Sequence, residues 1–209
     1  MTDIMPSNQS SMTPEQAAHA RRGIERRMRR AAALAAAQEK QRRTDELFMR
    51  KALDQARRAA ALGEVPIGCV IVCDGRVIGR GFNRRLSSHS TLAHAEIIAI
   101  RQACKKLGDW RLEDFDMYVT LEPCTMCSGA IIQSRIRKVY FGAYEPKSGA
   151  VVSCNDIFEV SHGHNHKVEF EGGILEKECS QMMLDFFRAI RKRDAGKKRS
   201  GNQTSTNSQ

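Results

Sequence analysis

Four residues in the middle of the chain combine three zinc-type ligands with a carboxylate. His94 and Glu96 stand two positions apart, and Cys124 and Cys127 follow within the segment Pro123-Cys124-Thr125-Met126-Cys127. Structural zinc sites usually have four protein ligands, whereas catalytic sites have three and leave the fourth position to water. We therefore predict that the histidine and the two cysteines bind a catalytic zinc ion, with Glu96 as the proton carrier beside it.

These groups suit a hydrolytic deamination. Zinc lowers the pKa of bound water from 15.7 to about 7, which yields a nucleophile for an electron-poor ring carbon that carries an amino group. Glu96 can take the water proton, pass it to a ring nitrogen and then protonate the departing ammonia. A C-x-x-C pair alone more often indicates a structural zinc or a redox pair. The upstream His-x-Glu and the strand–Pro–Cys context favour catalysis.

The two cysteines are predicted to open a helix over 124–134. Residues three apart lie on one face of a helix, so both sulfurs can reach one metal ion. Pro123 suits the first helical position, because the N–H that proline lacks is not needed there. The positive end of the helix dipole lowers the pKa of a thiol, and the thiolate is the form that binds metal.

Strands alternate with helices along the rest of the chain. Thr44 is predicted to cap a helix that ends before Gly63, and His94 begins one that runs to about Leu107. A further helix covers about 175–193 and is predicted to close the domain with Leu184, Phe186, Phe187 and Ile190. One ring of the Phe186-Phe187 pair is predicted to lie in the core, which leaves the other free to contact nucleotides. Strands are predicted over 67–73, 76–82, 117–121, 138–142 and 167–170. This order predicts an α/β fold with helices on both faces of a sheet.

The net charge of +10 lies at the two ends of the chain. Residues 1–44 carry nine Lys and Arg against four Asp and Glu, and residues 188–209 carry seven against one. Basic ends favour a polyanionic partner, although charged tails can also merely solvate a protein. We predict a basic Ala/Arg-rich extension over 1–44, partly disordered, a catalytic domain over 45–195 and a disordered basic and polar tail over 196–209.

The cysteines indicate a reducing compartment, and the hydropathy pattern predicts no membrane-spanning helix. We therefore expect a cytoplasmic protein without membrane contact. Seven cysteines show no disulfide spacing, and the five outside the C-x-x-C pair are predicted to be buried small hydrophobes. No apolar run approaches the length of a membrane-spanning helix. The Arg-rich residues 15–43 remain open to three interpretations, namely a nucleic-acid-binding arm, a plain helical extension or an organelle transit peptide.

From about Asp45 to Arg193 the chain resembles the cytidine-deaminase-like superfamily, and most closely its bacterial tRNA-specific adenosine deaminases. The pattern His-x-Glu…Pro-Cys-x-x-Cys is the superfamily's signature. Longer shared segments narrow the resemblance to the tRNA-specific group: Glu64-Val65-Pro66-Ile67-Gly68, Gly81-Phe82-Asn83-Arg84, Ala93-His94-Ala95-Glu96, Thr120 to Ile131, Ser134-Arg135-Ile136, Phe141-Gly142-Ala143, Pro146 to Ala150 and Asp185 to Arg188.

The resemblance implies a three-layer α/β/α sandwich with a mixed five-stranded sheet, a homodimer and one Zn²⁺ per subunit. It implies deamination of adenosine to inosine at the wobble position of a tRNA anticodon stem-loop. It also implies four substrate-binding residues. Asn83 matches an asparagine that contacts the nucleoside, and Val65 and Ile67 match walls of the base pocket. The fourth is Ala95. Arg188 and Arg191 would contact RNA phosphates.

Three departures from the family pattern concern the substrate side. Ser90-Thr91-Leu92 replaces the usual Asp-Pro-Thr, Glu145 replaces an aspartate, and residues 1–44 have no counterpart in compact family members. The tract His162-Gly163-His164-Asn165-His166 resembles a metal-binding run, but we interpret it as a surface loop, and Trp110 as a packing residue.

Three other functions remain open at the level of sequence. One is deamination of a free base or nucleoside, with guanine as the best candidate, because guanine deaminases share H-A-E and E-P-C-x-M-C. Another is an RNA-binding module stabilised by zinc, which would not need Glu96. The last is the catalytic subunit of a heteromeric deaminase.

Overall fold

The computed structural model describes residues 13–159 and 163–203, with 16, 17, 20 and 196–203 described by their backbone alone. The chain divides into two compact units, Met1–Arg43 and Thr44–Gln209. The disorder predicted near the two ends falls mainly on 1–12 and 204–209, which lie outside the described residues. Within the described ranges, no helix has the length and apolar character that a membrane crossing requires.

Helix α1 (Pro14–Ala61) passes through the boundary between the two units without a break. The prediction that Thr44 caps a new helix was wrong, because Thr44 lies inside α1. The segment 24–61 contains neither glycine nor proline and is rich in Ala, Arg, Lys and Gln, all of which favour helix. No residue of this stretch is a strong helix breaker, so the helix continues through Thr44.

The second unit is built on a mixed five-stranded sheet, as predicted. Its strands are β1 (Gly68–Cys73), β2 (Arg76–Phe82), β3 (Asp116–Leu121), β4 (Lys138–Ala143) and β5 (Glu169–Glu171), in the order β2-β1-β3-β4-β5. Strand β1 runs antiparallel to β2 and to β3, whereas β3, β4 and β5 are parallel. Asp74 and Gly75 join β1 to β2 with φ of 48° and 71°, the positive values that a tight hairpin turn requires.

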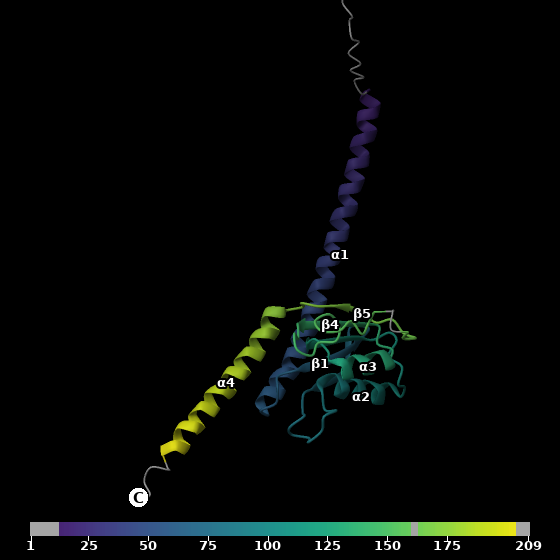
Figure 1. Cartoon of the computed structure of the whole chain (residues 1–209). Helices are drawn as coiled ribbons and strands as arrows, with labels where there is room; N and C mark the ends of the chain where they lie inside the picture. Colours follow the sequence, from purple (N-terminus) through teal and green to yellow (C-terminus); the bar gives the residue numbers. More distant parts are fainter. Residues whose placement is uncertain (1–12, 160–162, 204–209) are drawn as a thin grey trace, which may run out of the picture. The chain divides into compact units, whose positions relative to one another are not determined.

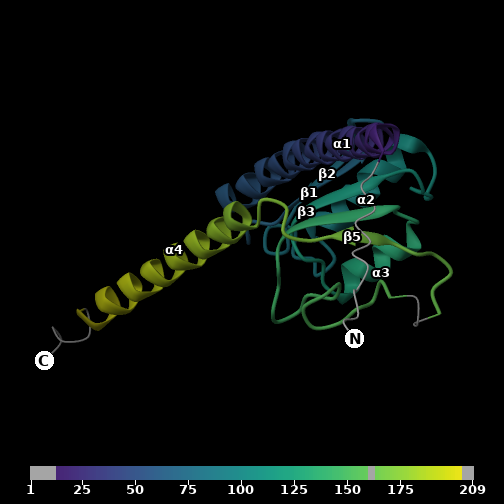
Figure 2. The same cartoon turned by 90° about the horizontal axis from the view of Figure 1, so that it is seen from above.

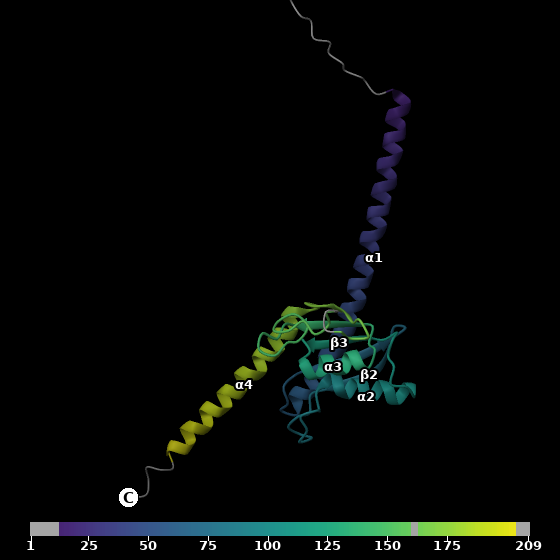
Figure 3. The same cartoon turned by 45° about the vertical axis from the view of Figure 1, so that its right-hand side comes forward.

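Helices cover both faces of this sheet and form two hydrophobic clusters. Helices α2 (Ala95–Leu107) and α3 (Thr125–Gln133) lie side by side over one face, as Figures 1 and 3 show. On the opposite face, seen in Figure 2, the part of α1 from Thr44 onward packs on β1 and β3 through Phe48, Met49, Ala52 and Leu53. The sheet is therefore the middle layer of an α/β/α sandwich.

Helix α4 (Glu176–Gln203) is longer than predicted and contributes less to the core than predicted. It continues to Gln203, through part of the segment predicted as a disordered tail. Cys179 is buried, but Leu184 and Phe187 are 49% and 40% exposed. The prediction that Leu184 helps to close the core was wrong, and of the Phe186-Phe187 pair it is Phe187 that is the more exposed; both side chains are available to line a surface cavity instead.

Candidate active site

The three predicted zinc ligands come from the first turns of α2 and α3. His94 is the N-cap of α2 and Cys124 is the N-cap of α3, both with extended backbone, and neither side chain caps its helix. N-cap side chains commonly accept a hydrogen bond from the first helical N–H groups. Here both are turned instead toward each other and toward Cys127, in the first turn of α3.

The prediction for Pro123 was wrong by a small shift. Helix α3 begins at Thr125, so Pro123 lies before the cap rather than in the first helical position. Its carbonyl oxygen accepts a hydrogen bond from the N–H of Ala150 at 2.9 Å. Pro123 therefore lies in the connection between β3 and α3, and its bond to Ala150 holds the chain just before the N-cap Cys124.

The donor set fits one zinc ion. The Nδ1 atom of His94 lies 3.7 Å from the sulfur of Cys124 and 3.5 Å from that of Cys127, and the three ligand atoms all lie within 4.8 Å of one another. A tetrahedral ion with ordinary Zn–S and Zn–N bond lengths separates such atoms by about 3.6 Å. Two sulfurs and one imidazole nitrogen leave a fourth position for water, which is the pattern of a catalytic zinc site.

The protonation of the thiols also favours metal binding. The hydrogen bond from Cys127, together with one from His94, lowers the pKa of Cys124 to about 4. The same contact with Cys124 raises the pKa of Cys127, because Cys127 holds the proton that the two sulfurs share. This arrangement favours the thiolate form of Cys124, and binding of a cation would displace the proton of Cys127.

Glu96 lies beside the ligands in the first turn of α2 and is only 4% exposed. Burial raises the pKa of this carboxyl, and the negative charge of Cys124 raises it further. A carboxyl whose pKa is shifted toward neutrality can both accept and deliver a proton at physiological pH.

A cavity of about 530 Å³ opens onto these residues, a size that suits a small ligand or one nucleotide. It is lined by Val65, Ile67, Asn83, Arg85, His94, Glu96, Leu121, Glu122, Cys124, Glu145, Pro146, Lys147, Ser148, Met183, Leu184 and Phe187. The structure thus brings together the predicted residues Asn83, Val65 and Ile67 with the metal ligands and Glu96.

Four predicted site residues do not line this cavity. Cys127, a predicted zinc ligand, is fully buried in the first turn of α3. Ala95 is fully buried, and a side-chain carbon at Gly81 would collide with its carbonyl oxygen, so it fixes the start of α2 against β2. Arg188 and Arg191 are exposed on α4, and Arg188 lies 3.6 Å from Asp185. Their predicted RNA contacts remain a proposal.

Sequence reasoning missed most of one wall of the cavity. Met183, Leu184 and Phe187 come from α4, where apolar residues at helical spacing suggested core packing. Two exposed cations, Arg85 and Lys147, also line the cavity. Lys147 belongs to the segment Pro146 to Ala150 that carries the family resemblance, whereas the only signal for Arg85 was its place in a loop beside a predicted site segment.

Glu122 organises the loop on the other wall. Its carboxylate accepts hydrogen bonds from the backbone N–H groups of Glu145 at 3.0 Å, Val151 at 3.1 Å, Val152 at 2.8 Å and Ser153 at 2.9 Å, and from the Ser153 hydroxyl. Although burial raises its pKa, these hydrogen bonds hold the pKa of Glu122 below its usual range. The loop 145–153 is thereby tied to the segment that carries Cys124.

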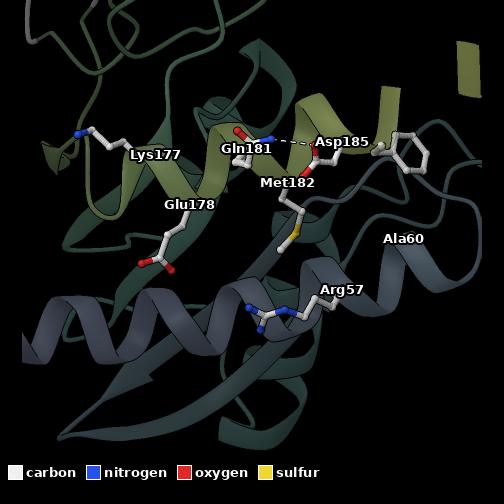
Figure 4. A pocket seen from close by; sticks show the side chains of 8 residues that line it. Arg57, Ala60, Lys177, Glu178, Gln181, Met182 and Asp185 are labelled. Carbon is white, nitrogen blue, oxygen red and sulfur yellow. Dashed lines mark hydrogen bonds between the residues drawn. The ribbon is translucent and has the colours of Figure 1, made fainter. Parts of the chain in front are cut away.

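A larger hollow lies elsewhere and lacks this chemistry. About 710 Å³ in volume, it is lined by Arg57, Ala60, Lys177, Glu178, Gln181, Met182, Asp185 and Phe186. Figure 4 shows Met182 pointing from α4 toward the helix that carries Arg57, and Gln181 bonded to Asp185 at 2.8 Å. Its two carboxylates, Glu178 and Asp185, are exposed, and among the described side chains they belong to no group of metal ligands.

Two other predictions about single residues were corrected. Of the five cysteines predicted to be buried, Cys154 is exposed and Cys73 and Cys104 are half-buried. Trp110 is 51% exposed, with Arg111 stacked 4.6 Å from its ring centre. In the histidine tract, His162 lies outside the described residues, and the ring of His166 bonds the Ile136 carbonyl at 2.8 Å. Among the side chains that the structure describes, no second group of metal ligands comes together.

Comparison with known proteins agrees with this site. Residues 42–143 match the family model for the cytidine and deoxycytidylate deaminase zinc-binding region. A tRNA-specific adenosine deaminase of Bacillus subtilis (strain 168) is 46% identical over 149 residues, which cover 71% of this chain and 92% of that protein. Another, from Agrobacterium fabrum (strain C58 / ATCC 33970), is 49% identical over 144 residues, or 69% of this chain and 94% of that protein.

A solved structure gives the same result at the level of the fold. It comes from biochemical and structural studies of A-to-I editing by tRNA:A34 deaminases at the wobble position of transfer RNA. It is 48% identical, has a TM-score of 0.62, and covers 65% of this chain and 97% of its own. With a matching fold and this identity over nearly the whole of its relatives, the chain belongs to the family of tRNA-specific adenosine deaminases.

Proposed function

We propose that this protein is a zinc-dependent hydrolase that converts adenosine to inosine at the wobble position of tRNA anticodons. The observation that carries the proposal is the group of His94, Cys124 and Cys127 beside the buried acid Glu96, at one cavity. Relatives at 46% and 49% identity are tRNA-specific adenosine deaminases.

The reaction consumes water and adenosine and releases inosine and ammonia. His94, Cys124 and Cys127 would hold a zinc ion, and such an ion would supply an activated water by lowering its pKa. Glu96 would accept one proton from this water and deliver it to a ring nitrogen, and would then take the second proton from the hydroxyl added to the ring carbon and pass it to the leaving amine, which departs as ammonia. The raised pKa of Glu96 suits this work, because the carboxyl must be charged when it accepts and neutral when it donates.

An anticodon loop is a suitable source of the base. Its nucleotides are single-stranded, so turning one out of the stack costs only a few kcal/mol. Val65, Ile67 and Phe187 offer apolar walls for the base, and Asn83 offers hydrogen bonds. The exposed cations Arg85 and Lys147 stand where neighbouring phosphates would pass.

The two ends of the chain extend this electrostatic match. We assign Arg188 and Arg191, exposed on α4, to further phosphate contacts. Six arginines between Arg21 and Arg30 are also exposed, in a segment with one glutamate. A basic extension over 1–44 that attracts tRNA and a deaminase domain over 45–195 account for this distribution.

The resemblance to the family supports a homodimer with one zinc per subunit. An enzyme of tRNA would work in the cytoplasm, where its substrate is used in translation. All seven cysteines are free, as a reducing compartment requires.

The decisive experiment is to measure inosine in a tRNA transcript that carries adenosine at the wobble position, with free guanine in a parallel reaction. Inosine at that position, absent in E96A, is the expected result. Xanthine from guanine without inosine would assign the enzyme to free bases. No product from a protein with one zinc per chain would contradict the proposal and favour an obligate partner or a zinc-stabilised binding module.

A further inference from the structure

Asn83 reaches the cavity with its amide already held from behind. It follows directly after β2, is 3% exposed, and its backbone N–H donates to the Ile67 carbonyl at 3.0 Å. Its side-chain Nδ2 donates to an oxygen of Glu64 at 3.3 Å. Glu64 is 1% exposed, lines a separate hollow of about 320 Å³ that shares Asn83, and is absent from the lining of the zinc-site cavity. Within the zinc-site cavity it therefore acts on a bound nucleoside through Asn83 rather than by contact.

The carboxylate of Glu64 has a second task. Its other oxygen accepts the backbone N–H of Ser87 at 2.6 Å, and the N–H of Leu86 also donates to it. Although burial raises its pKa, these hydrogen bonds hold the pKa of Glu64 below its usual value. The group is thus a charged acceptor that joins Asn83 to residues 86 and 87 in the loop that follows β2.

A carboxylate can only accept hydrogen bonds, so it dictates which way the neighbouring amide faces. An asparagine has a carbonyl oxygen and an NH₂ group that exchange places when the amide turns over. Beside Glu64 only the NH₂ group can face the carboxylate, because two oxygens would repel each other. The Oδ1 atom of Asn83 is consequently directed elsewhere, as an acceptor.

We propose that Glu64 is a positioning residue for the deamination: it locks the Asn83 amide so that its oxygen accepts a hydrogen bond from a donor on the target nucleoside, a hydroxyl or an amino group. The inference rests on the proposed function and adds that the cavity presents a hydrogen-bond acceptor, not a donor, at Asn83. It also makes the loop at 86 and 87 part of the substrate site, since one carboxylate holds both.

The replacement E64Q tests this polarity. The glutamine amide has one acceptor oxygen, whereas the carboxylate has two. We expect this oxygen to keep the short hydrogen bond from the Ser87 N–H. The introduced NH₂ group then faces Asn83, whose amide must turn over and present NH₂ to the cavity. We expect kcat/KM for tRNA to fall on the order of 10- to 100-fold, the usual effect of one mispaired buried hydrogen bond. Because Asn83 is not a reacting group, most of the fall appears in KM.

A second replacement in the same enzyme separates polarity from general damage. N83D alone places two carboxylates together and is expected to be at least as impaired as E64Q. In the double variant E64Q/N83D, one oxygen of the new carboxylate accepts from the introduced amide and the other faces the cavity as an acceptor. The KM of the double variant is therefore expected to lie within about threefold of the wild-type KM. The residual difference reflects the imperfect additivity of substitutions at residues in contact.

D45N is the matched control. Asp45 is another buried carboxylate, 2% exposed, and accepts a hydrogen bond from Tyr118 at 2.7 Å in the cluster on the opposite face of the sheet. It should lower the melting temperature without raising KM. Wild-type KM in E64Q, or a double variant worse than both single ones, would overturn the role of Glu64. A wild-type enzyme that forms no inosine would instead refute the proposed function, and the role of Glu64 with it.

Discussion

Glu96 and Glu122 lie on the same cavity, are almost equally buried, and have opposite protonation tendencies. Each is at most 4% exposed. Burial raises the pKa of Glu96, and the hydrogen bonds it receives from its own N–H and from Cys127 do not offset that effect. Glu122 receives four backbone N–H groups and a hydroxyl, which hold its pKa below normal. Burial alone therefore does not identify a catalytic carboxylate; the number of donors around it does.

The comparison divides the site into a reactive part and a supporting part. Glu96 and the ligand sulfurs can change protonation state, which chemistry requires. Glu122 and Glu64 are fixed as acceptors and hold loops in place. Each prediction below tests one side of this division.

The largest effect is expected from removal of a ligand. C124A should lose zinc and with it all inosine formation, because a histidine and one cysteine hold zinc weakly. C179A makes the same change at a buried cysteine whose pKa burial raises to about 12 and which is no ligand. It should retain one zinc per chain, measured by inductively coupled plasma mass spectrometry. Full zinc occupancy in C124A would show that the ligand set is wrong.

Replacement of the reactive carboxylate comes next. E96Q should lower kcat by about 10²- to 10⁴-fold, the usual contribution of a general acid–base group, while zinc content stays at one per chain. Single-turnover inosine formation gives the rate. A rate within tenfold of the wild type would remove Glu96 from proton transfer and end the contrast with Glu122.

Replacement of the supporting carboxylate should act on stability. E122Q offers one acceptor oxygen to five donors, so we expect a loss of about 2–3 kcal/mol in the free energy of unfolding by urea, with an accompanying loss of activity. A change below about 0.5 kcal/mol would mean that the loop 145–153 does not depend on Glu122.

The pH dependence of unfolding provides the check on E122Q. The folded pKa of Glu122 lies below the unfolded one, so its contribution is fully present above the unfolded pKa near 4.3 and is lost as pH falls through the folded pKa. The wild type should therefore lose more stability than E122Q between pH 6 and 3, a window set by that unfolded value. Equal slopes would contradict the lowered pKa.

The charges at the cavity should have a smaller effect. R85Q/K147Q should raise KM for tRNA by roughly 3- to 10-fold at 0.1 M salt and reduce the salt dependence of binding. R42Q/R43Q removes two exposed charges that are already paired with Glu39, at 2.9 Å and 2.8 Å, and serves as the control. Equal effects of the two double variants would mean that only net charge matters.

The smallest change in catalysis should follow deletion of residues 1–43. No residue of the described segment 13–43 lines the cavity, so kcat should stay within about twofold of the wild type. Steady-state inosine formation on tRNA measures it, and KM can rise through the lost arginines. A collapse of kcat would show that the extension completes the active site.

The sequence predicted the reactive part better than the supporting part, for a physical reason. His94, Glu96, Cys124 and Cys127 are fixed by spacing along two helices, and Asp74-Gly75 by the dihedral angles of its turn. Such local rules can be applied without a structure. The partners of Glu64 and Glu122 lie 19 to 31 residues away, so nothing near either glutamate announces its role.

Helix α4 shows the same limit from the other side. Its apolar residues have the spacing of a core-facing helix, but Leu184 and Phe187 face a cavity. A hydrophobic wall for a base and a hydrophobic core have the same sequence pattern. Only the placement of the helix distinguishes them.

The cavity takes its floor and its walls from different parts of the chain. Two helix starts supply the metal ligands and Glu96, while α4 and the loop 145–153 supply much of the wall. Mutations in α4 can therefore change which substrates are accepted without touching the proton chemistry. Because of this division, evolution or protein engineering can change substrate specificity by successive substitutions in α4 while every variant along the way keeps its catalytic groups.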